Sequence, residues 1–532
     1  MGGMGGMGGA GGSAGTGGTG GIPGTGGGGP IACDPNIQIP CYTGPAGTIG
    51  IGLCKPGALE CAADGTLFGQ CTGDVVPVAD ACGNAADDDC NGATDEFCAS
   101  WSKRFGASGD QRGLGLAVGA DGRIVMVGRM VGMANFGAGA LTSAGGFDAF
   151  VAKFEPDGTL IWAKRYGSSN DEEARAVAID PMGNIIVVGN HAGTIGFGSA
   201  ADPTHTNLGG DDAFVAKLGP DGAYKWSRSF GGANDQYALS VATDATGNVV
   251  IGGGYAGDIN FGAGLTSTAT DWLDGFIIRL DNTGTTVWAK EFGTWGYDDA
   301  MGVALAPNGD VLIAGQYDTE VDFGMGSPPD LDGEDMFIAR LDPAGNQLSL
   351  IPFGGPGDQE PIGAGLTTAG NFVVAGNFSS QIDFGNGPHT SQGGDDLFAV
   401  EFDAMGTAVW ERTFGGPFEQ FMAGMAVNPA GGAAIVGSMQ TTLDTGNGPP
   451  LVNIDPSSTA NDDIFLVNIS PDGKTKYAKN FGDIDDQDGR ATAIGPDGSI
   501  YITGEFAGAM NMGTGTLTSA SGDDAYLAKF PP

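Results

Sequence analysis

The chain repeats itself seven times, and this repetition limits its possible folds more than any other feature of the sequence. From Trp101 onward an acidic residue leads into an apolar run, as in DAFVAKF, DGFIIRL and DLFAVEF. Seven copies of one such run predict seven copies of one structural unit. The central aromatic residue of the run recurs every 61 to 67 residues, at Phe150, Phe214, Phe276, Phe337, Phe398, Phe465 and Tyr526.

Two further markers accompany each copy. One is an aromatic residue followed four residues later by aromatic-Gly, as in WSKRFG at Trp101 and WAKRYG at Trp162; one copy, LSLIPFG ending at Phe353, is degenerate. The other is a short apolar run ending in Gly, such as IVMVG, which follows a turn containing Gly. These runs are rich in Val, Ile, Phe, Trp and Tyr and lack a helical period, so each unit is expected to hold about four strands.

Repeats of several strands predict an all-β fold, a seven-bladed β-propeller over residues 99–532 in which each blade is one small sheet. The last strand of each unit is the one that carries aromatic-Gly. The array begins with an extra copy of this strand, at about residues 101–106, and the final unit ends at Phe530 without one. We therefore expect the first strand to close the last blade, which removes two open sheet edges. An open solenoid is the alternative architecture.

The chain before the repeats divides into two parts by composition. Residues 1–30 are mostly Gly, Met, Ala, Ser and Thr and are expected to form a disordered tether, because they cannot bury enough apolar surface to fold. Residues 31–98 hold all eight cysteines, without a C-x-x-C spacing. This favours a disulfide-rich module in an oxidising compartment over a zinc site. The pairing stays open, because eight cysteines allow about 105 connectivities.

The charge is strongly negative, with 63 acidic against 22 basic residues and a net charge of -41. Such a surface repels nucleic acid, attracts cations and helps an exported protein to stay in solution as a monomer. No apolar run is long enough to span a bilayer. Met1 to Gly12 have neither a basic nor an apolar region, so we expect an export signal upstream of Met1, an extracellular or cell-surface location, and anchoring through the tether.

These markers resemble the repeats of the bacterial seven-bladed β-propeller family known as SBBP. The resemblance covers roughly residues 101–532. It rests on the turn and strand of Asp180 to Gly189, the strand of Asp148 to Lys153, and the Trp-to-Phe-Gly strand. It implies the propeller fold and no particular activity.

The segment CGNAADDDCNGATDE, from Cys82 to Glu96, resembles the metal-binding motif of bacterial surface proteins of the MopE type. Aligned with a calcium loop, it puts oxygen-bearing residues at alternate positions and Gly92 at the sharp turn. Position 12 is Cys98 rather than a bidentate Glu, which departs from the EF-hand pattern. A polar, disulfide-flanked turn that binds nothing is the alternative. The candidate cofactor is Ca²⁺, and its candidate ligands are Asp87, Asp89, Asn91, Asp95 and Glu96.

Acidic residues also recur within the repeats, and sevenfold symmetry would place them in rings. Such rings could bind cations, although we favour capping of turns, because repetition in every blade is what folding requires. One set precedes the marker strand, for example Asp211 and Asp212, Asp395 and Asp396, and Asp523 and Asp524. Another set follows aromatic-Gly, at Asp110, Asp171, Asp235, Asp298, Asp358, Glu419 and Asp486.

Histidine and tryptophan give little sign of catalysis. His191 occupies a position that holds large packing side chains in the other units, and His205 and His389 occupy equivalent loops of two units. The tryptophans recur with the repeat, which predicts a place in the core. HExxH, P-loop and nucleophile-elbow patterns are absent from the sequence.

These features favour an exported or cell-surface scaffold, without catalytic residues, that binds or displays a protein or glycan on its propeller face. One alternative is an extracellular propeller enzyme, a lyase or hydrolase acting on a polymer, which would need a non-repeated cluster of polar residues. Another is a structural protein stabilised by calcium. Unit four, with Pro352, Pro356 and Pro361, and unit six, with an insertion near Pro449 to Pro456, depart most from the repeat.

Overall fold

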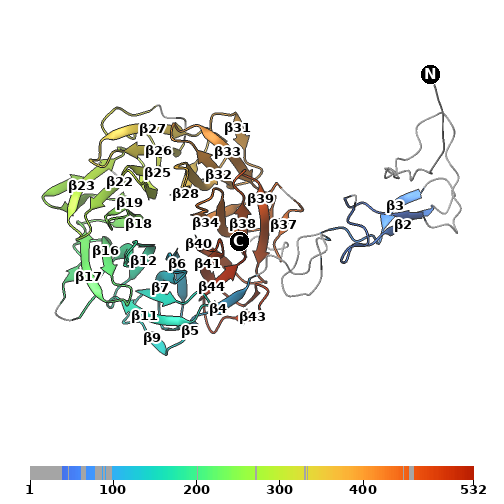
Figure 1. Cartoon of the computed structure of the whole chain (residues 1–532), viewed down its shortest axis with the longest axis horizontal. Helices are drawn as coiled ribbons and strands as arrows, with labels where there is room; N and C mark the ends of the chain where they lie inside the picture. The colour runs from blue at the N-terminus through green and yellow to red at the C-terminus, as the bar shows by residue number, and fades with distance from the viewer. Residues whose placement is uncertain are drawn as a thin grey trace, which may run out of the picture.

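The computed structural model describes residues 39–45, 47–61, 68–77, 87, 90, 99–199, 202–269, 272–328, 331, 333–446, 448–454 and 461–532. These residues form strands and no helix, so none of them supplies a helix that could cross a membrane. Seven antiparallel sheets of four strands form a closed ring around a central channel (Figure 1). The prediction of an all-β, seven-bladed propeller is confirmed.

Each blade has four strands, ordered from the channel outward. The inner strands of blades 1 to 7 are β6 (Gln111–Val118), β12 (Glu172–Ile179), β18 (Gln236–Thr243), β24 (Asp299–Leu305), β28 (Gln359–Leu366), β34 (Gln420–Val427) and β40 (Gln487–Ile494). The second strands are β7 (Ile124–Met130), β13 (Ile185–His191), β19 (Val249–Tyr255), β25 (Val311–Tyr317), β29 (Phe372–Phe378), β35 (Ala433–Met439) and β41 (Ile500–Phe506).

The third strands are β10 (Asp148–Phe154), β16 (Asp212–Leu218), β22 (Asp274–Leu280), β26 (Asp335–Leu341), β32 (Asp396–Phe402), β38 (Asp463–Ile469) and β44 (Asp524–Phe530). The outer strands are β11 (Leu160–Tyr166), β17 (Tyr224–Phe230), β23 (Thr286–Phe292), β27 (Gln347–Phe353), β33 (Ala408–Phe414), β39 (Thr475–Phe481) and, for blade 7, β4 (Trp101–Arg104). The three sequence markers thus correspond to the second, third and outer strands of a blade.

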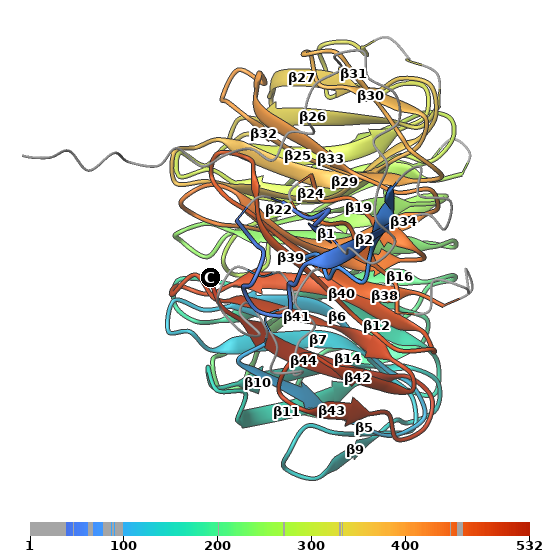
Figure 2. The same cartoon turned by 90° about the vertical axis from the view of Figure 1, so that its right-hand side faces the viewer.

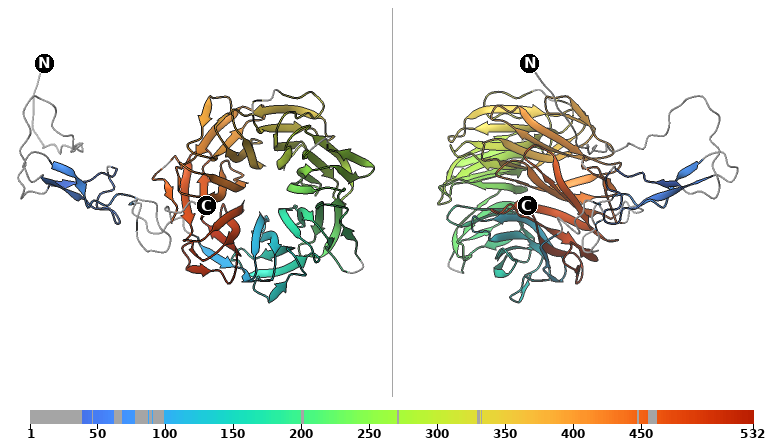
Figure 3. Two further views of the ribbon diagram at one scale, coloured as in Figure 1. Left: turned by 180° about the vertical axis from the view of Figure 1, so that it is seen from behind. Right: turned by 45° about the vertical axis from the view of Figure 1, so that its right-hand side comes forward.

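Closure of the ring follows the expected scheme. Strand β4 pairs antiparallel with β44, with Trp101 opposite Lys529 and Arg104 opposite Tyr526. The first strand of the array therefore completes the blade made by the last residues of the chain. Figure 2 shows β44 beside the strands of blade 1, and the view from behind in Figure 3 shows the same closed ring.

Small hairpins between the second and third strands account for the length of the repeat. The described hairpins are β8 (Met133–Asn135) with β9 (Ala140–Thr142), β14 (Thr194–Gly196) with β15 (Thr204–Thr206), β20 (Asp258–Gly262) with β21 (Leu265–Thr268), β30 (Gln381–Asp383) with β31 (Pro388–Thr390), β36 (Thr442–Leu443) with β37 (Leu451–Val452), and β42 (Ala509–Asn511) with β43 (Thr516–Thr518). In blade 1, β5 (Gly106–Ser108) adds a third strand to β8 and β9.

The acidic marker and the aromatic-Gly marker lie against each other in space. The Asp at the start of each third strand is buried, and in most blades it accepts a hydrogen bond from a backbone N–H just upstream, as Asp524 does from Ala520 at 2.8 Å. A Cβ added at Gly106 would overlap the carboxyl of Asp524, and one at Gly354 would overlap that of Asp335. Most blades therefore need both the carboxyl and the glycine beside it, which explains why the two recur together; in blade 3 the glycine, Gly293, faces Asp298 instead.

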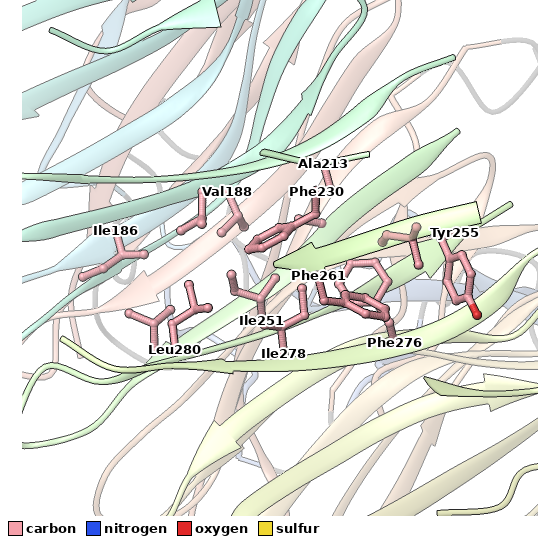
Figure 4. Close-up of a cluster of buried hydrophobic side chains, with 14 of the residues drawn as sticks. Ile186, Val188, Ala213, Phe230, Ile251, Tyr255, Phe261, Phe276, Ile278 and Leu280 are labelled. Atoms are coloured by element: carbon pink, nitrogen blue, oxygen red, sulfur yellow. The ribbon is translucent and has the colours of Figure 1, made fainter. Parts of the chain in front are cut away.

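The hydrophobic core is divided into seven clusters, one between each pair of neighbouring blades. Figure 4 shows the cluster between blades 2 and 3, to which Phe230 of β17 and both Phe261 and Phe276 of blade 3 belong. The side chains of the second and third strands are buried on both sheet faces, as continuous apolar runs predict. Burial between blades, rather than within one sheet, makes the ring a single cooperative unit.

A separate three-stranded sheet precedes the ring, formed by β1 (Ile39–Cys41), β2 (Gly57–Cys61) and β3 (Phe68–Thr72). The structure describes two disulfides there, Cys41–Cys71 and Cys54–Cys90. The expected disulfide framework is therefore present. The glycine-rich segment of residues 1–30 lies outside the described residues.

Candidate functional site

The seven inner strands begin at the same end of the channel, and the second residue of each strand, or the first residue in β24, forms its rim. Just before the rim lies a position that is fully buried in every blade and serves folding: Gln111, Glu172, Gln236, Asp298, Gln359, Gln420 and Gln487. The next residue differs from blade to blade. It is Arg112, Glu173, Tyr237, Asp299, Glu360, Phe421 or Asp488. Variation at equivalent positions is what a local site requires, because the fold itself imposes the same demand on every blade.

Basic residues cluster on one side of the rim, in blades 7, 1 and 2. Nη2 of Arg490 lies 2.8 Å from Glu505 and 2.9 Å from Asp488. Arg112 reaches from blade 1 to Asp523 of blade 7 at 3.1 Å. On the other flank of blade 1, Arg129 pairs with Glu173 of blade 2 at 3.4 Å. The carboxylates on this side are therefore largely neutralised.

The other side of the rim, in blades 4 to 6, is acidic. We call Asp299, Glu334, Glu360, Asp395 and Asp462 the acidic rim. Among the described residues, none of these five carboxyl groups forms an ion pair with a Lys or Arg.

Burial raises the pKa of each member of the acidic rim, and neighbouring carboxylates add to the effect. The pKa of Asp299 rises to about 8 through burial and the nearby Glu360. Burial together with Asp488 and Asp486 raises the pKa of Asp462 to about 6. Glu334, Glu360 and Asp395 also have raised pKa values for these two reasons. A bound cation would relieve this mutual repulsion.

Three exposed aromatic residues border the acidic rim at blades 3 and 4, and we call Trp272, Trp295 and Tyr297 the aromatic edge. Trp272 is 65% exposed and Trp295 is 67% exposed. The rings of Trp272 and Tyr297 meet edge to face with centroids 5.6 Å apart. The backbone fixes their loops, because Leu273 N donates to Gly296 O and Asp298 N donates to Leu273 O at 2.9 Å.

The aromatic edge replaces a packing pair that other blades use for folding. In blade 2, Gly210 lies against Asp235, and the carboxyl of Asp235 accepts the backbone N–H of Asp211 at 2.8 Å. Gly146 and Asp171 form the same arrangement. At the equivalent positions of blades 3 and 4 stand Trp272 and Tyr297. Both members of the pair have changed together, from a compact contact to an exposed aromatic one.

This geometry corrects two sequence interpretations. Five tryptophans do lie at interfaces between blades, but Trp272 and Trp295 are exposed and do not belong to the core. Asp298 was grouped with the acids that follow aromatic-Gly, whereas that position in blade 4 is Tyr297 and Asp298 fills the buried glutamine position. For Asp171 and Asp235, the favoured role in organising turns agrees with the hydrogen bonds that they accept.

The channel inside the rim is narrow, with a cavity of about 230 Å³. A β-bulge in six of the inner strands turns one residue per strand into it, and Arg175 and Arg490 are the two charged side chains at this position. Nε of Arg175 donates to Oδ1 of Asn190 at 2.7 Å, and its guanidinium lies over the Tyr237 ring.

The histidines have structural contacts. His191 is fully buried in β13, with Nδ1 2.8 Å from Gly193 O and Nε2 2.9 Å from Ser229 Oγ. His205 lies 2.8 Å from Ser227 Oγ, and His389 lies 3.0 Å from Glu411. His205 and His389 are on hairpins of different blades, so they share no site.

Only one of the five predicted calcium ligands falls within the described residues. Asp87 is buried and its backbone O accepts a hydrogen bond from Leu53 N at 3.0 Å, beside the Cys54–Cys90 disulfide. Asp89, Asn91, Asp95 and Glu96 lie outside the described residues. Within the part of the chain that is described, no group of three or more His, Cys, Asp or Glu side chains could hold a metal ion.

Comparison with known proteins supports the propeller class. No family model matches the chain. It is 21% identical over 447 residues to an uncharacterised WD repeat-containing protein, L264, of Acanthamoeba polyphaga mimivirus, covering 73% of this chain and 29% of that protein. It is 26% identical over 139 residues to the regulatory protein FlaEY of Caulobacter vibrioides, covering 26% of this chain and 14% of that protein. The chain thus spans less than a third of the length of either relative.

Several solved structures are similar at low TM-score. They include the WD40 domain of Neurospora crassa Pan2, at 10% identity over 63% of this chain and 86% of that one, with a TM-score of 0.30. YCF48 bound to D1 peptide is 9% identical over 81% of this chain and 94% of that one, with a TM-score of 0.36. An ulvan lyase of family PL25 is 12% identical over 79% of this chain and 97% of that one, with a TM-score of 0.40. These values assign no function to this chain, which is a seven-bladed β-propeller.

Proposed function

We propose that the protein is an exported or cell-surface scaffold that binds a partner through the acidic rim and the aromatic edge. The observation that supports this most is the aromatic edge itself. Two indoles more than 60% exposed, at positions where equivalent loops carry small residues, have no role in folding the blade. Exposed aromatic residues beside charged groups are typical of binding surfaces.

The charge of this surface favours a basic partner, and we propose a lysine- or arginine-rich segment of a protein. The members of the acidic rim other than Asp299 form no ion pair among the described residues and attract cationic groups, and indole faces bind ammonium and guanidinium groups by cation–π interaction. Nucleic acid and anionic glycans would be repelled. The exposed indoles could also stack on a neutral glycan, so the test includes one.

The first prediction concerns an oligo-lysine peptide titrated calorimetrically into the protein. The double variant Trp272→Ala, Trp295→Ala is expected to bind about five- to thirtyfold more weakly, since each exposed cation–π contact contributes about 0.5–1 kcal/mol. Affinity should also fall as salt rises, because the attraction is electrostatic. Met182→Ala, which removes an exposed side chain on the opposite face, is the matched control and should bind as the unaltered protein does.

Equal binding by the double variant and the unaltered protein would contradict this function. If the protein binds a neutral oligosaccharide with an affinity that does not depend on salt, and the double variant does not bind it, the same surface binds a glycan.

Calcium in the cysteine-rich segment remains a separate proposal. We propose that Asp87, Asp89, Asn91, Asp95 and Glu96 hold Ca²⁺, because alternating oxygen donors near a turn are what this cation prefers. The two disulfides described in this part of the chain constrain it and are consistent with export. The SBBP repeat markers and the MopE-type motif support placing the chain among bacterial surface proteins.

The second prediction is that calorimetric titration with calcium shows one site that is lost in the variant Asp89→Asn. Asp472→Asn, an exposed aspartate of the propeller, is the control and should leave the calcium heat unchanged. If the calcium heat persists in Asp89→Asn, the metal binds elsewhere in the chain. If neither the unaltered protein nor the variants give a calcium heat, the proposed site does not bind calcium.

A single observation favours the alternative of a polymer-degrading enzyme. The pKa of Asp299 is about 8, so this carboxyl is protonated at neutral pH and could act as a general acid beside ionised carboxylates. This is the non-repeated polar cluster that the sequence did not reveal. Release of new reducing ends from a neutral polysaccharide, lost in Asp299→Asn, would establish that activity.

A further inference from the structure

At the face of the ring opposite the rim, an aromatic side chain joins six of the seven blades to the next blade. It comes from the outer strand and packs on the turn between the third and outer strands of the following blade. Trp226 of blade 2 donates its indole N–H to Asn282 O at 3.1 Å, and Trp288 of blade 3 donates to Pro343 O at 3.1 Å. The residues in this position are Trp101, Trp162, Trp226, Trp288, Trp410 and Tyr477.

Glycine makes room for these rings. A Cβ added at Gly284 would lie 2.7 Å from the Trp226 ring, and one at Gly345 would lie 3.0 Å from the Trp288 ring. Both glycines have a positive φ and end the turn on which the ring rests. The turn and the ring of the preceding blade are therefore a matched pair.

The interface between blades 4 and 5 keeps the turn and lacks the ring. Strand pairing places Ser349 opposite Arg340, where Trp288 stands opposite Arg279 in blade 3. The turn of blade 5 still has its glycine, Gly406, with a positive φ. The degenerate LSLIPFG copy of the sequence marker is this position.

A cavity of about 320 Å³ occupies the interface where the ring is missing. Its walls are mostly apolar, with Leu312, Ile338, Ile351 and Phe372 among the lining residues, and Ser349 opens onto it. This volume is at the lower end of the range of small-ligand pockets, roughly 300–1,000 Å³. A groove also lies between blades 1 and 2, but there Trp162 is present and donates to Pro220 O at 3.3 Å.

The polar contacts that the indole and Arg279 make at this end of the preceding interface are missing here as well. Ala404 is the counterpart of Asn282 and Pro343, whose carbonyls accept an indole N–H, and none of the described residues donates a hydrogen bond to the Ala404 carbonyl. Arg279 bridges to the next blade, donating to Gly309 O at 2.8 Å, whereas Arg340 turns to Asp310 of its own blade at 2.6 Å. The cavity thus offers apolar walls and one hydrogen-bond acceptor.

We propose that this cavity, at the one interface that lacks a tryptophan or tyrosine ring, binds an indole ring supplied by another molecule. Ile351 itself packs on the turn at Gly406, so the ring lies beside Ile351 in the cavity, where its N–H donates to the Ala404 carbonyl. The ligand is a tryptophan side chain of a peptide or a free indole, which share this chemistry. This site is independent of the acidic rim, because it is at the other end of the strands.

The test is calorimetric titration of the full chain with indole and with N-acetyl-tryptophanamide. We expect saturable binding at one site per chain. Ser349→Trp places the chain's own ring in the cavity and should weaken binding at least about tenfold, because one large side chain fills the space. Ser349→Ala keeps the cavity and should bind within about twofold of the unaltered protein. Binding of both ligands points to a peptide partner, and binding of indole alone points to a small molecule.

A second variant keeps the proposal testable if Ser349→Trp does not fold. Trp288→Ser removes the ring at the preceding interface and should raise the number of bound indoles from one to two per chain. The proposal is overturned if neither ligand binds the unaltered protein, or if Ser349→Trp binds as the unaltered protein does.

Discussion

Deleting residues 99–105 is expected to abolish cooperative folding of the propeller. The deletion removes β4, so the backbone of β44 loses its outer partner and becomes an open edge. It also removes Phe105, which is 3% exposed and packs on Phe136 and Phe154 with centroids 5.3 Å and 5.2 Å away. Trp101, whose N–H donates to Pro156 O of blade 1 at 3.2 Å, is lost too.

The expected cost of this deletion is comparable with the whole stability of a domain. Removing each buried large aromatic side chain costs about 3–5 kcal/mol, against a total of about 5–15 kcal/mol for a native protein. Urea unfolding followed by far-UV circular dichroism measures the effect, and deletion of residues 1–30 is the control. A midpoint that is unchanged by the loss of β4 would show that blade 7 does not close the ring.

Unfolding is expected to require more free energy at about pH 5 than at about pH 9. Burial raises the pKa of Asp298 and of Asp299 to about 8, far above the value of about 3.9 in an unfolded chain. Between these two pKa values the folded state binds more protons than the unfolded state, so stability falls as pH rises. Glu505, with a pKa raised to about 7 by burial, acts in the same direction.

Thermal unfolding at a series of pH values measures this dependence. Asp298→Asn removes one titrating carboxyl and should flatten the decline between about pH 5 and about pH 9. Asp472→Asn is the matched control: hydrogen bonds from Lys474 and Ser470 lower the pKa of Asp472 to about 2, so its effect lies below about pH 4. A melting temperature that rises steadily from about pH 5 to about pH 9 would contradict the burial of uncharged carboxyl groups at the rim.

The fold could be predicted from sequence because its determinants recur seven times. The Asp at the start of each third strand and the Gly after each outer strand, such as Asp524 and Gly106, are demands of the blade, so every copy shows them. Ring closure was also visible, because strand types at the two chain ends complement each other.

The candidate site could not be predicted in the same way. Trp272 and Tyr297 are 25 positions apart and meet only because the loops of neighbouring strands converge on the rim. Exposure of Trp295 is likewise a property of the assembled blade, since its residue type alone suggested a core position. Comparison of the seven copies position by position would have found one signal, the Trp at 272 in place of a small residue.

The acidic rim could not be recognised from the sequence, because its properties arise only in the folded ring. Asp299 and Glu360 belong to different blades, and the high pKa of Asp299 arises from burial together with that neighbour. The gap at Ser349 was visible as a degenerate marker, but only the packing of Trp226 and Trp288 on the following turns shows what is missing there. A departure from the repeat can be read in sequence, whereas its meaning depends on the contacts that the other copies make.

Oxidative footprinting of tryptophan tests the proposed binding surface most directly. The protein is oxidised by hydroxyl radicals with and without bound oligo-lysine peptide, and mass spectrometry measures the modification of each tryptophan. The account predicts that Trp272 and Trp295 react in the free protein and are protected in the complex, while Trp226 and Trp288 react little in either. Saturating peptide that leaves Trp272 and Trp295 as reactive as before would show that the partner binds elsewhere.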